Sequence, residues 1–241
     1  MVARNVAEHN AVGFENANAS GPLTVIGNRF TDNRVGLTLI SNYQEAFTPQ
    51  RGNVVVGNVI SDNNEPLSPR QESGGFGTGI GVSGAIGNTF SANRIENNIR
   101  AGLLFANTED LPAVGNTASD NVFSGNGVDV ANVSAGRAPA ANNCAYPAAD
   151  LSALPEALLA GCLEQPADSG PDQPAVSVAD LPAVDVPPGM SFLEVPVPGD
   201  QPQMPSASVV PTSPLPAAID HPDWGEVTIP DADLLADRTQ P

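Results

Sequence analysis

The sequence predicts an all-β solenoid of about five coils, followed by a disordered tail rich in Pro, Ala and Asp. Two observations predict the solenoid. A pair of asparagines five residues apart recurs through residues 1–143, and a short apolar run that contains glycine follows each pair. The third observation is compositional, because all 22 asparagines precede Cys144 whereas 18 of the 24 prolines lie from Cys144 onward.

The clearest copy of the repeat is residues 25–40, VIGNRFTDNRVGLTLI. Successive copies begin 23, 30, 35 and 28 residues apart, which suits single coils with loops of unequal length. Short runs of Val, Ile, Leu, Phe and Thr between Asn, Asp and Gly are typical of strands, and no helical period is present. A worn copy with Asn5 and Asn10 opens the chain, and the paired asparagines of the other copies are Asn28 and Asn33, Asn58 and Asn63, Asn93 and Asn98, and Asn121 and Asn126.

The repeated asparagines predict a ladder at two corners of each coil. Asn tolerates the left-handed backbone conformation that a tight corner requires, and amides stacked at the ~4.8 Å spacing of paired strands can hydrogen-bond along the stack. Between the corners, apolar side chains are expected to point inward in two rows. One row is Phe30, Ile60, Ile95 and Phe123, and the other is Leu37, Ile80, Leu103 and Val128.

The pattern G-N-x-[FIV]-x-x-N followed by G-[LI] resembles the repeat of right-handed parallel β-helix proteins of the pectate-lyase-like superfamily, over residues 1–143. The resemblance implies a secreted bacterial β-helix, in a superfamily that includes pectate lyases, polygalacturonases and alginate epimerases. The alternative at this period is a leucine-rich repeat, but its Leu-rich frame and outer helix are not visible.

The first coil is expected to be an open end. Met1 falls within a coil, and residues 1–4 are too few for a cap, so we expect the natural protein to extend further at this end. Residues 1–20 hold no signal peptide. A longer start would supply the leader of an extracellular or cell-surface protein. The unpaired strand edge predicts end-to-end self-association.

Residues 144–167 are expected to cap the other end. Pro155 and Glu156 suit the first turn of a short helix within residues 151–161. Cys144 and Cys162 flank this helix and indicate a disulfide, which a loop of this length would make worth ~3 kcal/mol. The alternative is a pair of free thiols in a reducing compartment.

Residues 168–241 carry the features of a disordered acidic segment. Residues 144–241 hold 15 acids and one arginine, against 12 acids and eight arginines before them. High Pro content and charge of one sign oppose the burial of enough apolar surface to order a chain. The acidic balance excludes nucleic acid as a partner, and no apolar run is long enough for a membrane span.

Candidate functional residues lie on the coils and in three long loops, 41–53, 64–78 and 106–115. Asp32 and Asp62 hold equivalent positions on neighbouring coils, where paired carboxylates could serve as acid and base or hold Ca²⁺; the other interpretation is a turn former. No other cofactor or metal is expected. Arg29 and Arg94 share an outward position that suits carboxylates, or exposed pairing with neighbouring acids. Further candidates for ligand binding are the loop residues Tyr43, Glu45, Arg51 and Arg70.

Two hypotheses of function follow. The first is a structural or glycan-binding β-helix module without a catalytic site, since no Ser-His-Asp set or metal cluster is present. The second, which rests on the resemblance, is an enzyme that acts on uronic polysaccharides as a lyase, hydrolase or epimerase. Polysaccharide is the partner of the glycan-binding form of the first hypothesis and of the second, whereas a purely structural module needs none.

Overall fold

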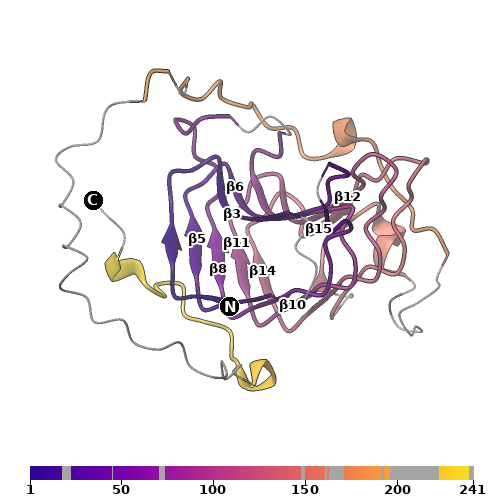
Figure 1. The fold of residues 1–241 in the computed structure, drawn as a ribbon, viewed down its shortest axis with the longest axis horizontal. Helices are drawn as coiled ribbons and strands as arrows, with labels where there is room; N and C mark the ends of the chain where they lie inside the picture. The colour runs from indigo at the N-terminus through magenta and orange to yellow at the C-terminus, as the bar shows by residue number, and fades with distance from the viewer. Residues whose placement is uncertain are drawn as a thin grey trace.

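The computed structural model describes residues 1–17, 23–44, 46–70, 74–147, 150–160, 162, 171–191, 193–195 and 223–238. Within these residues the chain forms a parallel β-helix (Figure 1). Each regular coil contributes one strand to each of three parallel sheets, so the coil is triangular in section.

The three sheets contain the following strands. Sheet A is β1 (Val2–Ala3), β4 (Thr24–Ile26), β7 (Val54–Val56), β10 (Thr89–Ser91), β13 (Thr117–Ser119) and β16 (Cys144–Ala145). Sheet B is β2 (Val6–Ala7), β5 (Arg29–Thr31), β8 (Val59–Ser61), β11 (Arg94–Glu96) and β14 (Val122–Ser124). Sheet C is β3 (Val12–Ala17), β6 (Val35–Ile40), β9 (Thr78–Ser83), β12 (Ala101–Ala106), β15 (Val130–Asn132) and β17 (Ala153–Leu154).

The core consists of inward side chains that stack along the coils. Phe30, Ile60, Ile95 and Phe123 pair in register, which confirms the first predicted row. The second row is Leu37, Ile80, Leu103 and Val130. Val128 was wrongly assigned to this row: in the last coil Asp129, not Gly127, holds the place of Gly102, so the strand starts two residues later. Val128 packs instead with Ala131 and Leu181 in a separate small cluster.

The predicted asparagine ladders are confirmed. Asn58 illustrates a rung: its Oδ1 accepts the backbone N–H and the Nδ2 of Asn28, both at 2.9 Å, and its own Nδ2 donates to Asn93 Oδ1 at 2.9 Å. The amide also bonds the carbonyl of Val25 at 3.0 Å, so it ties neighbouring coils together inside the corner.

The conformation of these corners differs from the prediction in one respect. The left-handed residue is the one that precedes each asparagine, since His9, Asp32, Asp62 and Asn97 have φ between 55° and 60°. The asparagine itself is free to turn its amide into the stack. The same arrangement holds at the first corner, where Asp120 precedes Asn121 with φ 56°.

A third asparagine ladder occupies the corner that precedes sheet A, and it was not predicted from the sequence. Its rungs are Asn53, Asn88, Asn116 and Asn143, each directly before a sheet A strand and at most 1% exposed. Gln50 joins it by a reciprocal pair of 3.0 Å bonds with Asn88. Loops of different length separate these asparagines from the first two ladders, and this hides their period in the sequence.

The C-terminal end of the stack is closed by residues after β16. The predicted capping helix corresponds to a 3₁₀ turn, η2 (Glu156–Leu159), whose Leu158 and Leu159 are buried in the main core. Cys144 and Cys162 form the predicted disulfide. The boundary at residue 167 lies outside the described residues and stays a prediction.

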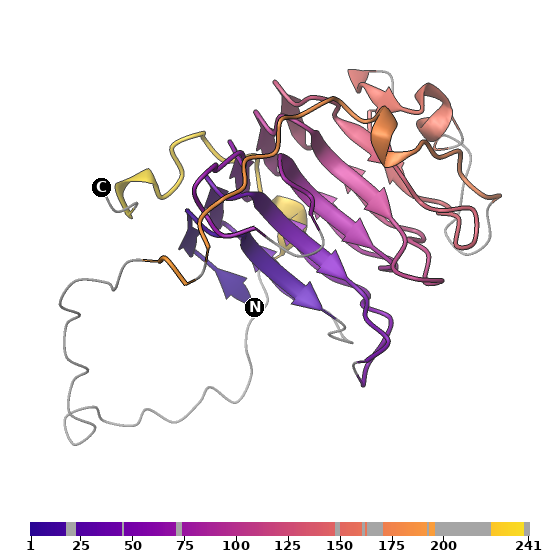
Figure 2. The same cartoon turned by 90° about the horizontal axis from the view of Figure 1, so that it is seen from above.

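The predicted disorder of the tail is not confirmed. Its described parts contain three short 3₁₀ turns, η3 (Val178–Asp180), η5 (Trp224–Glu226) and η6 (Ala236–Arg238). Residues 171–191 and 193–195 run along the sheet C side of the solenoid, and residues 223–238 lie near sheet B (Figures 1 and 2). The remainder of the tail, including 196–222, lies outside the described residues. Composition did not reveal these contacts because many of them use backbone carbonyls of the tail.

Candidate functional site

The candidate site lies on the outer face of sheet C. Side chains alternate along each strand, so Leu37 and Leu39 fill the core while Thr38 and Ile40 face outward. The outward row that contains Thr38 continues across the sheet through Gly81, Leu104 and Ala131. Leu104 and Ile40 make the outer face of sheet C partly apolar.

Residues 171–191, which we name the covering segment, lie over part of this face (Figure 2). The backbone N–H of Val176 bonds the carbonyl of Asn132 at 3.0 Å, and Asn132 Nδ2 donates to the carbonyl of Pro174 at 2.9 Å. Leu181, only 5% exposed, packs on Ala131 in the small outer cluster. The segment is therefore fixed at two points along the sheet.

A groove of about 210 Å³ remains between sheet C and the covering segment. Its polar side chains are Thr38, Thr78, Ser83 and Arg100, and Val178 and Leu181 of the covering segment also line it. Gly81 leaves the floor open, because a Cβ added there would meet only Thr38 Cγ2, at 3.5 Å. An apolar groove with a few convergent polar groups is typical of ligand-binding sites.

The groove adjoins a second hollow of about 210 Å³, which we name the arginine pocket. Arg34, Arg70 and Arg100 all line it, and Arg34 lies over the ring of Phe76. Gly74, Gly75, Arg100 and Val178 line both hollows, so the pocket and the groove adjoin. Three of the chain's nine arginines thus meet at one end of the groove.

Two of the arginines meet because they hold equivalent positions on different coils. The backbone N–H of Gly77 bonds the carbonyl of Arg34, and the N–H of Arg100 bonds the carbonyl of Gly77, so Arg34, Gly77 and Arg100 form a row. Gly77 has φ +82° and carries no side chain between the two arginines. A Cβ there would lie 2.8 Å from Ile99 Cγ1, so a larger residue would be strained.

Arg34 is the most deeply placed of the three, at 1% exposure. Its Nη1 donates to the carbonyls of Pro66 and Ser68 at 3.2 and 3.3 Å, and its Nη2 donates to the carbonyl of Pro187 at 2.6 Å. Its guanidinium stacks 4.7 Å from the centre of the Phe76 ring. Burial, and secondly the charge of Arg70, lower the pKa of Arg34 from its ordinary value.

Arg70 was a sequence candidate for ligand binding, and the structure places it in this pocket. Arg34 and Arg100 were missed, because they lie 66 residues apart with a glycine at the equivalent position between them. The available signal was their shared place two residues before a strand glycine, Gly36 or Gly102.

Asp32 and Asp62 stand on neighbouring coils as predicted, exposed and with φ 55° at both. The backbone N–H of Asp32 bonds the carbonyl of Ser61, so both residues form part of the corner. This is the geometry of the turn-former interpretation. Their role as a catalytic pair or Ca²⁺ site stays a prediction.

Arg29 and Arg94 contact the chain's own tail. Arg29 Nη1 donates to the carbonyl of Ala232 at 2.8 Å, and Arg94 Nε donates to the carbonyl of Pro230 at 2.9 Å. Arg94 also pairs with Glu96 at 2.7 Å. Residues 223–238 therefore occupy the outward arginine row that was considered for a ligand.

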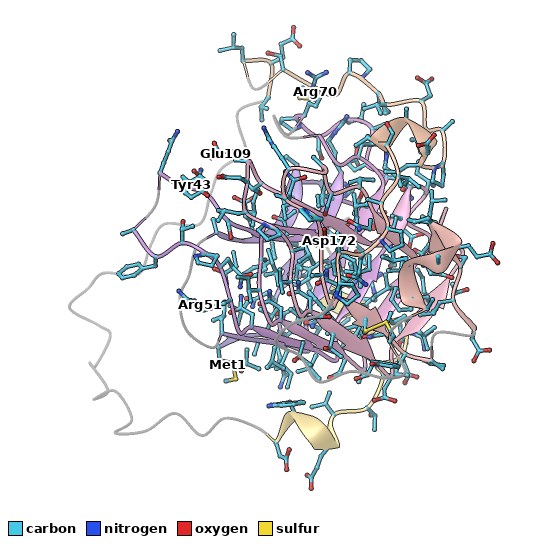
Figure 3. The ribbon with its side chains drawn as sticks, turned by 90° about the vertical axis from the view of Figure 1, so that its right-hand side faces the viewer. Met1, Tyr43, Arg51, Arg70, Glu109 and Asp172 are labelled. Carbon is cyan, nitrogen blue, oxygen red and sulfur yellow. A yellow bond between two sulfur atoms is a disulfide. The ribbon has the colours of Figure 1, made fainter. Side chains whose placement is uncertain are left out.

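The remaining candidates are distant from the arginine pocket. Figure 3 shows Tyr43 and Arg51 well apart from Arg70. Tyr43 is half exposed, and a hydrogen bond with Asp110 raises the pKa of its hydroxyl. Arg51 is exposed beside the third corner, and Glu45 lies outside the described residues.

A comparison with protein families gives one match. The sequence profile of a family described as "Periplasmic copper-binding protein (NosD)" matches residues 1–143, more than half of the chain. The chain belongs to the NosD family. This family consists of right-handed β-helices, which agrees with the three parallel sheets and the predicted hand. No curated protein and no solved structure matches the chain.

The family's description raises the question of a copper site. Copper is held in proteins mainly by imidazole, thiolate and thioether ligands. Both cysteines of this NosD-family chain are in the disulfide, and the described residues contain no group of three or more His, Cys, Asp and Glu side chains that could hold a metal. His221 lies outside the described residues.

The nearest approach to a copper donor set is a surface hollow lined by His9, Glu65 and Met190. His9 Nδ1 lies 2.9 Å from Glu65 Oε2, and Glu65 Oε1 accepts the N–H of Leu67 at 2.7 Å. The His9 imidazole and the Met190 thioether are the two donors of this hollow of the kind that copper prefers. These described residues do not make a closed copper site, so the function proposed below does not involve copper.

The family's name places it in the periplasm. Among the described residues there is no helix of the length and apolar character that a membrane crossing requires.

Proposed function

We propose that this NosD-family chain is a non-catalytic periplasmic or extracellular β-helix module that binds an extended glycan along the sheet C groove. The observation that carries the proposal is the groove itself, an open channel that runs across Thr38, Gly81 and Leu104 on successive coils. Solenoids use such extended outer surfaces for binding, since each coil adds an equivalent contact.

The composition of the groove supports a glycan rather than a globular partner. Leu104, Ile40 and Val133 offer apolar surface, and Thr38 and Ser83 carry hydroxyl groups, of which that of Thr38 donates to Glu15 Oε2 at 3.1 Å. A sugar chain presents both apolar ring faces and hydroxyl groups, so it can use both kinds of contact. The covering segment limits access from above, which favours a thin ligand over a second folded domain.

The competing hypothesis is an enzyme on uronic polysaccharides. The arginine pocket favours it, because a guanidinium can hold a uronate carboxylate. The candidate acids Asp32 and Asp62 sit at the corner between sheets B and C and do not line the groove. Binding without turnover is therefore the function we infer.

The test is a binding and activity screen with a groove-filling variant. Gly81→Val adds a side chain to the groove floor at an ordinary contact distance from Thr38, so the strand should keep its fold. Gly136→Val is the matched control, because no atom lies within 4 Å of a Cβ added there. Pectate, alginate and a neutral glucan are assayed for retention on affinity gels and for new reducing ends or unsaturated product.

We expect the wild-type chain and Gly136→Val to bind at least one polysaccharide without product, and Gly81→Val to lose that binding. Equal binding by both variants would move the site away from the groove, and product formation would favour the enzyme. End-to-end self-association stays a separate prediction, which sedimentation at several concentrations tests.

A further inference from the structure

We propose that Arg34, Arg70 and Arg100 form a binding site for an oxyanion, a carboxylate or phosphate group carried by the ligand of the groove. The inference rests on the proposed function of the groove and specifies the chemistry at one end of it. Neither the family's name nor the sequence candidates assign a role to Arg34 and Arg100.

The arginines of the pocket form no ion pair with the described acids. The ion pairs found among the described residues are His9 with Glu65 and Arg94 with Glu96, and neither involves an arginine of the pocket. The acids nearest in sequence on the covering segment also leave the pocket arginines unpaired, because Asp180 bonds the N–H of Ser177 and Asp185 is exposed without an ion pair. In a chain of net charge −18, three arginines line one pocket, and Glu65, the described carboxylate whose charge acts on Arg34, is already bonded to His9 and to the N–H of Leu67.

The positive charge of Arg34 is destabilised in the pocket. The burial of Arg34 and its proximity to Arg70 both oppose its positive charge, which is why its pKa is lowered. Backbone carbonyls are the hydrogen-bond partners of Arg34, and the nearby charge of Glu65 favours the positive charge of Arg34 less than burial and Arg70 oppose it, so its pKa stays lowered. A bound oxyanion would relieve the repulsion between Arg34 and Arg70.

Two of the arginines, Arg34 and Arg100, are held in place by contacts within the chain. Arg34 is fixed by three loop carbonyls, by Pro187 and by the Phe76 ring. Arg100 is oriented by its Nε, which donates to the carbonyl of Phe76 at 3.0 Å. Phe76, 5% exposed, thus positions two of the arginines, one with its ring and one with its backbone. Preorganised donors bind anions without a further ordering cost.

The volume and the walls of the arginine pocket limit which ligand it can bind. The arginine pocket has a volume of about 210 Å³ and is walled by Val178 and Val186 on the side of the covering segment. This suits one anionic group rather than a polyanionic surface. It shares Gly74, Gly75 and Arg100 with the groove, so a ligand with its anionic group in the pocket would have the rest of its length beside sheet C.

Arg70→Ala is the variant that tests the site. Arg70 lines the pocket but takes part in no hydrogen bond or ion pair found among the described residues, so its removal should not disturb the fold. Arg51→Ala is the matched control, because it removes the same charge from an exposed position outside the pocket. The full chain and each variant are titrated calorimetrically with inorganic phosphate and with glucuronate, and glucose is the uncharged control.

We expect saturable binding of phosphate, glucuronate or both to the wild-type chain and to Arg51→Ala, and affinity about tenfold lower in Arg70→Ala. Whichever anion binds better identifies the source of the oxyanion. No saturable binding of either anion, or equal affinity in the two variants, would overturn the proposal. The groove would still stand as a glycan site if a neutral glucan bound and Gly81→Val abolished that binding.

Glu72 lies outside the described residues but within the same loop, so Glu72→Gln is titrated as well. Unchanged or modestly stronger anion binding in this variant agrees with a site for an external ligand. Binding that appears only in Glu72→Gln would show that the pocket holds an internal carboxylate, and it would reject the proposal.

Discussion

The coils and the C-terminal segments of this chain are held together in different ways. In the coils, the same amide contact recurs at every level, and Asn28, Asn58 and Asn93 each bond the next rung through both a backbone N–H and a side-chain Nδ2. In the C-terminal segments, each contact occurs once, such as Leu181 on Ala131 or Arg94 on the carbonyl of Pro230. Repetition makes the first region rigid and recognisable, whereas single contacts leave the second region dependent on a few residues.

The largest expected effect is the loss of a central rung. Asn58→Ala removes an acceptor for two Asn28 groups and the donors to Val25 and Asn93, all in a fully buried corner. Buried groups left without partners should lower the free energy of unfolding by about 4 kcal/mol. Urea denaturation followed by far-UV circular dichroism measures this loss.

Gln173→Ala is the matched control for that variant, because Gln173 makes the corresponding contact from outside the coils, with Oε1 accepting from Asn143 Nδ2 at 3.0 Å. It lies partly in solvent, so water can replace the lost bonds and the loss should be smaller. Equal losses for both amides would remove the distinction between repeated and single contacts.

The next effect concerns the disulfide, which joins the last sheet A strand to Cys162, three residues after η2. Replacing Cys144 and Cys162 by Ala releases a loop of 18 residues, which should cost about 3 kcal/mol of stability. Comparison of wild type and the double variant under oxidising conditions measures it, and wild type under reducing conditions should match the variant. A change below about 1 kcal/mol would mean that the core contacts of Leu158 and Leu159 hold the cap without it.

A smaller and more local effect is expected for the covering segment. Leu181→Ala removes the main apolar contact of the segment with sheet C and should cost about 2 kcal/mol. Hydrogen exchange should then rise at Val176, whose N–H bonds Asn132, while the amide protons of the ladder corners stay protected. If protection of the coils fell to the same degree, the segment would be a cooperative part of the solenoid.

The smallest effect is a dependence on pH. The hydrogen bond with Glu65 raises the pKa of His9 above 6.5. Burial by itself would raise the pKa of Glu65, but the bonds from Leu67 and His9 outweigh it and lower that pKa below 4.5. The pair therefore stabilises fully between pH 4.5 and 6.5; its contribution falls as pH drops through the pKa of Glu65 or rises through that of His9.

His9 is largely exposed, so the pair should contribute less than about 1 kcal/mol. His9→Gln should flatten the difference in melting temperature between pH 6 and pH 8.5, with Asn64→Gln as a control on the same loop. A pH profile that His9→Gln leaves unchanged would assign the dependence to other groups.

The same contrast explains how much the sequence could predict. The two ladders at fixed spacing, the row from Phe30 to Phe123 and the disulfide were predicted, because a stacked coil copies its contacts and the copies are visible as a period. The third ladder was missed since the loop before Asn53 and the one before Asn116 differ in length. The arginine pocket was missed because it is built from non-identical residues, with Gly77 between Arg34 and Arg100.

Contacts of the tail were missed for another physical reason. Composition reports whether side chains can form a core, and residues 168–241 cannot form one of their own. It does not report that the carbonyls of Pro174, Pro187 and Pro230 will accept hydrogen bonds from side chains of the coils. A segment without a core can thus be ordered by a surface that supplies the donors.

Gln173 carries a consequence for how such a chain can change its length over evolution. Its Nε2 turns back to the carbonyls of Asn143 and Leu158, at 2.7 and 3.2 Å, so the last rung consumes the acceptors that a further coil would use. In every earlier rung the asparagine carbonyl is open to the next coil, and no contact within a coil depends on how many coils the stack contains. Gene duplication of one coil ahead of Asn143 would therefore lengthen the molecule without a new terminus, because the existing ending fits the last coil of any stack.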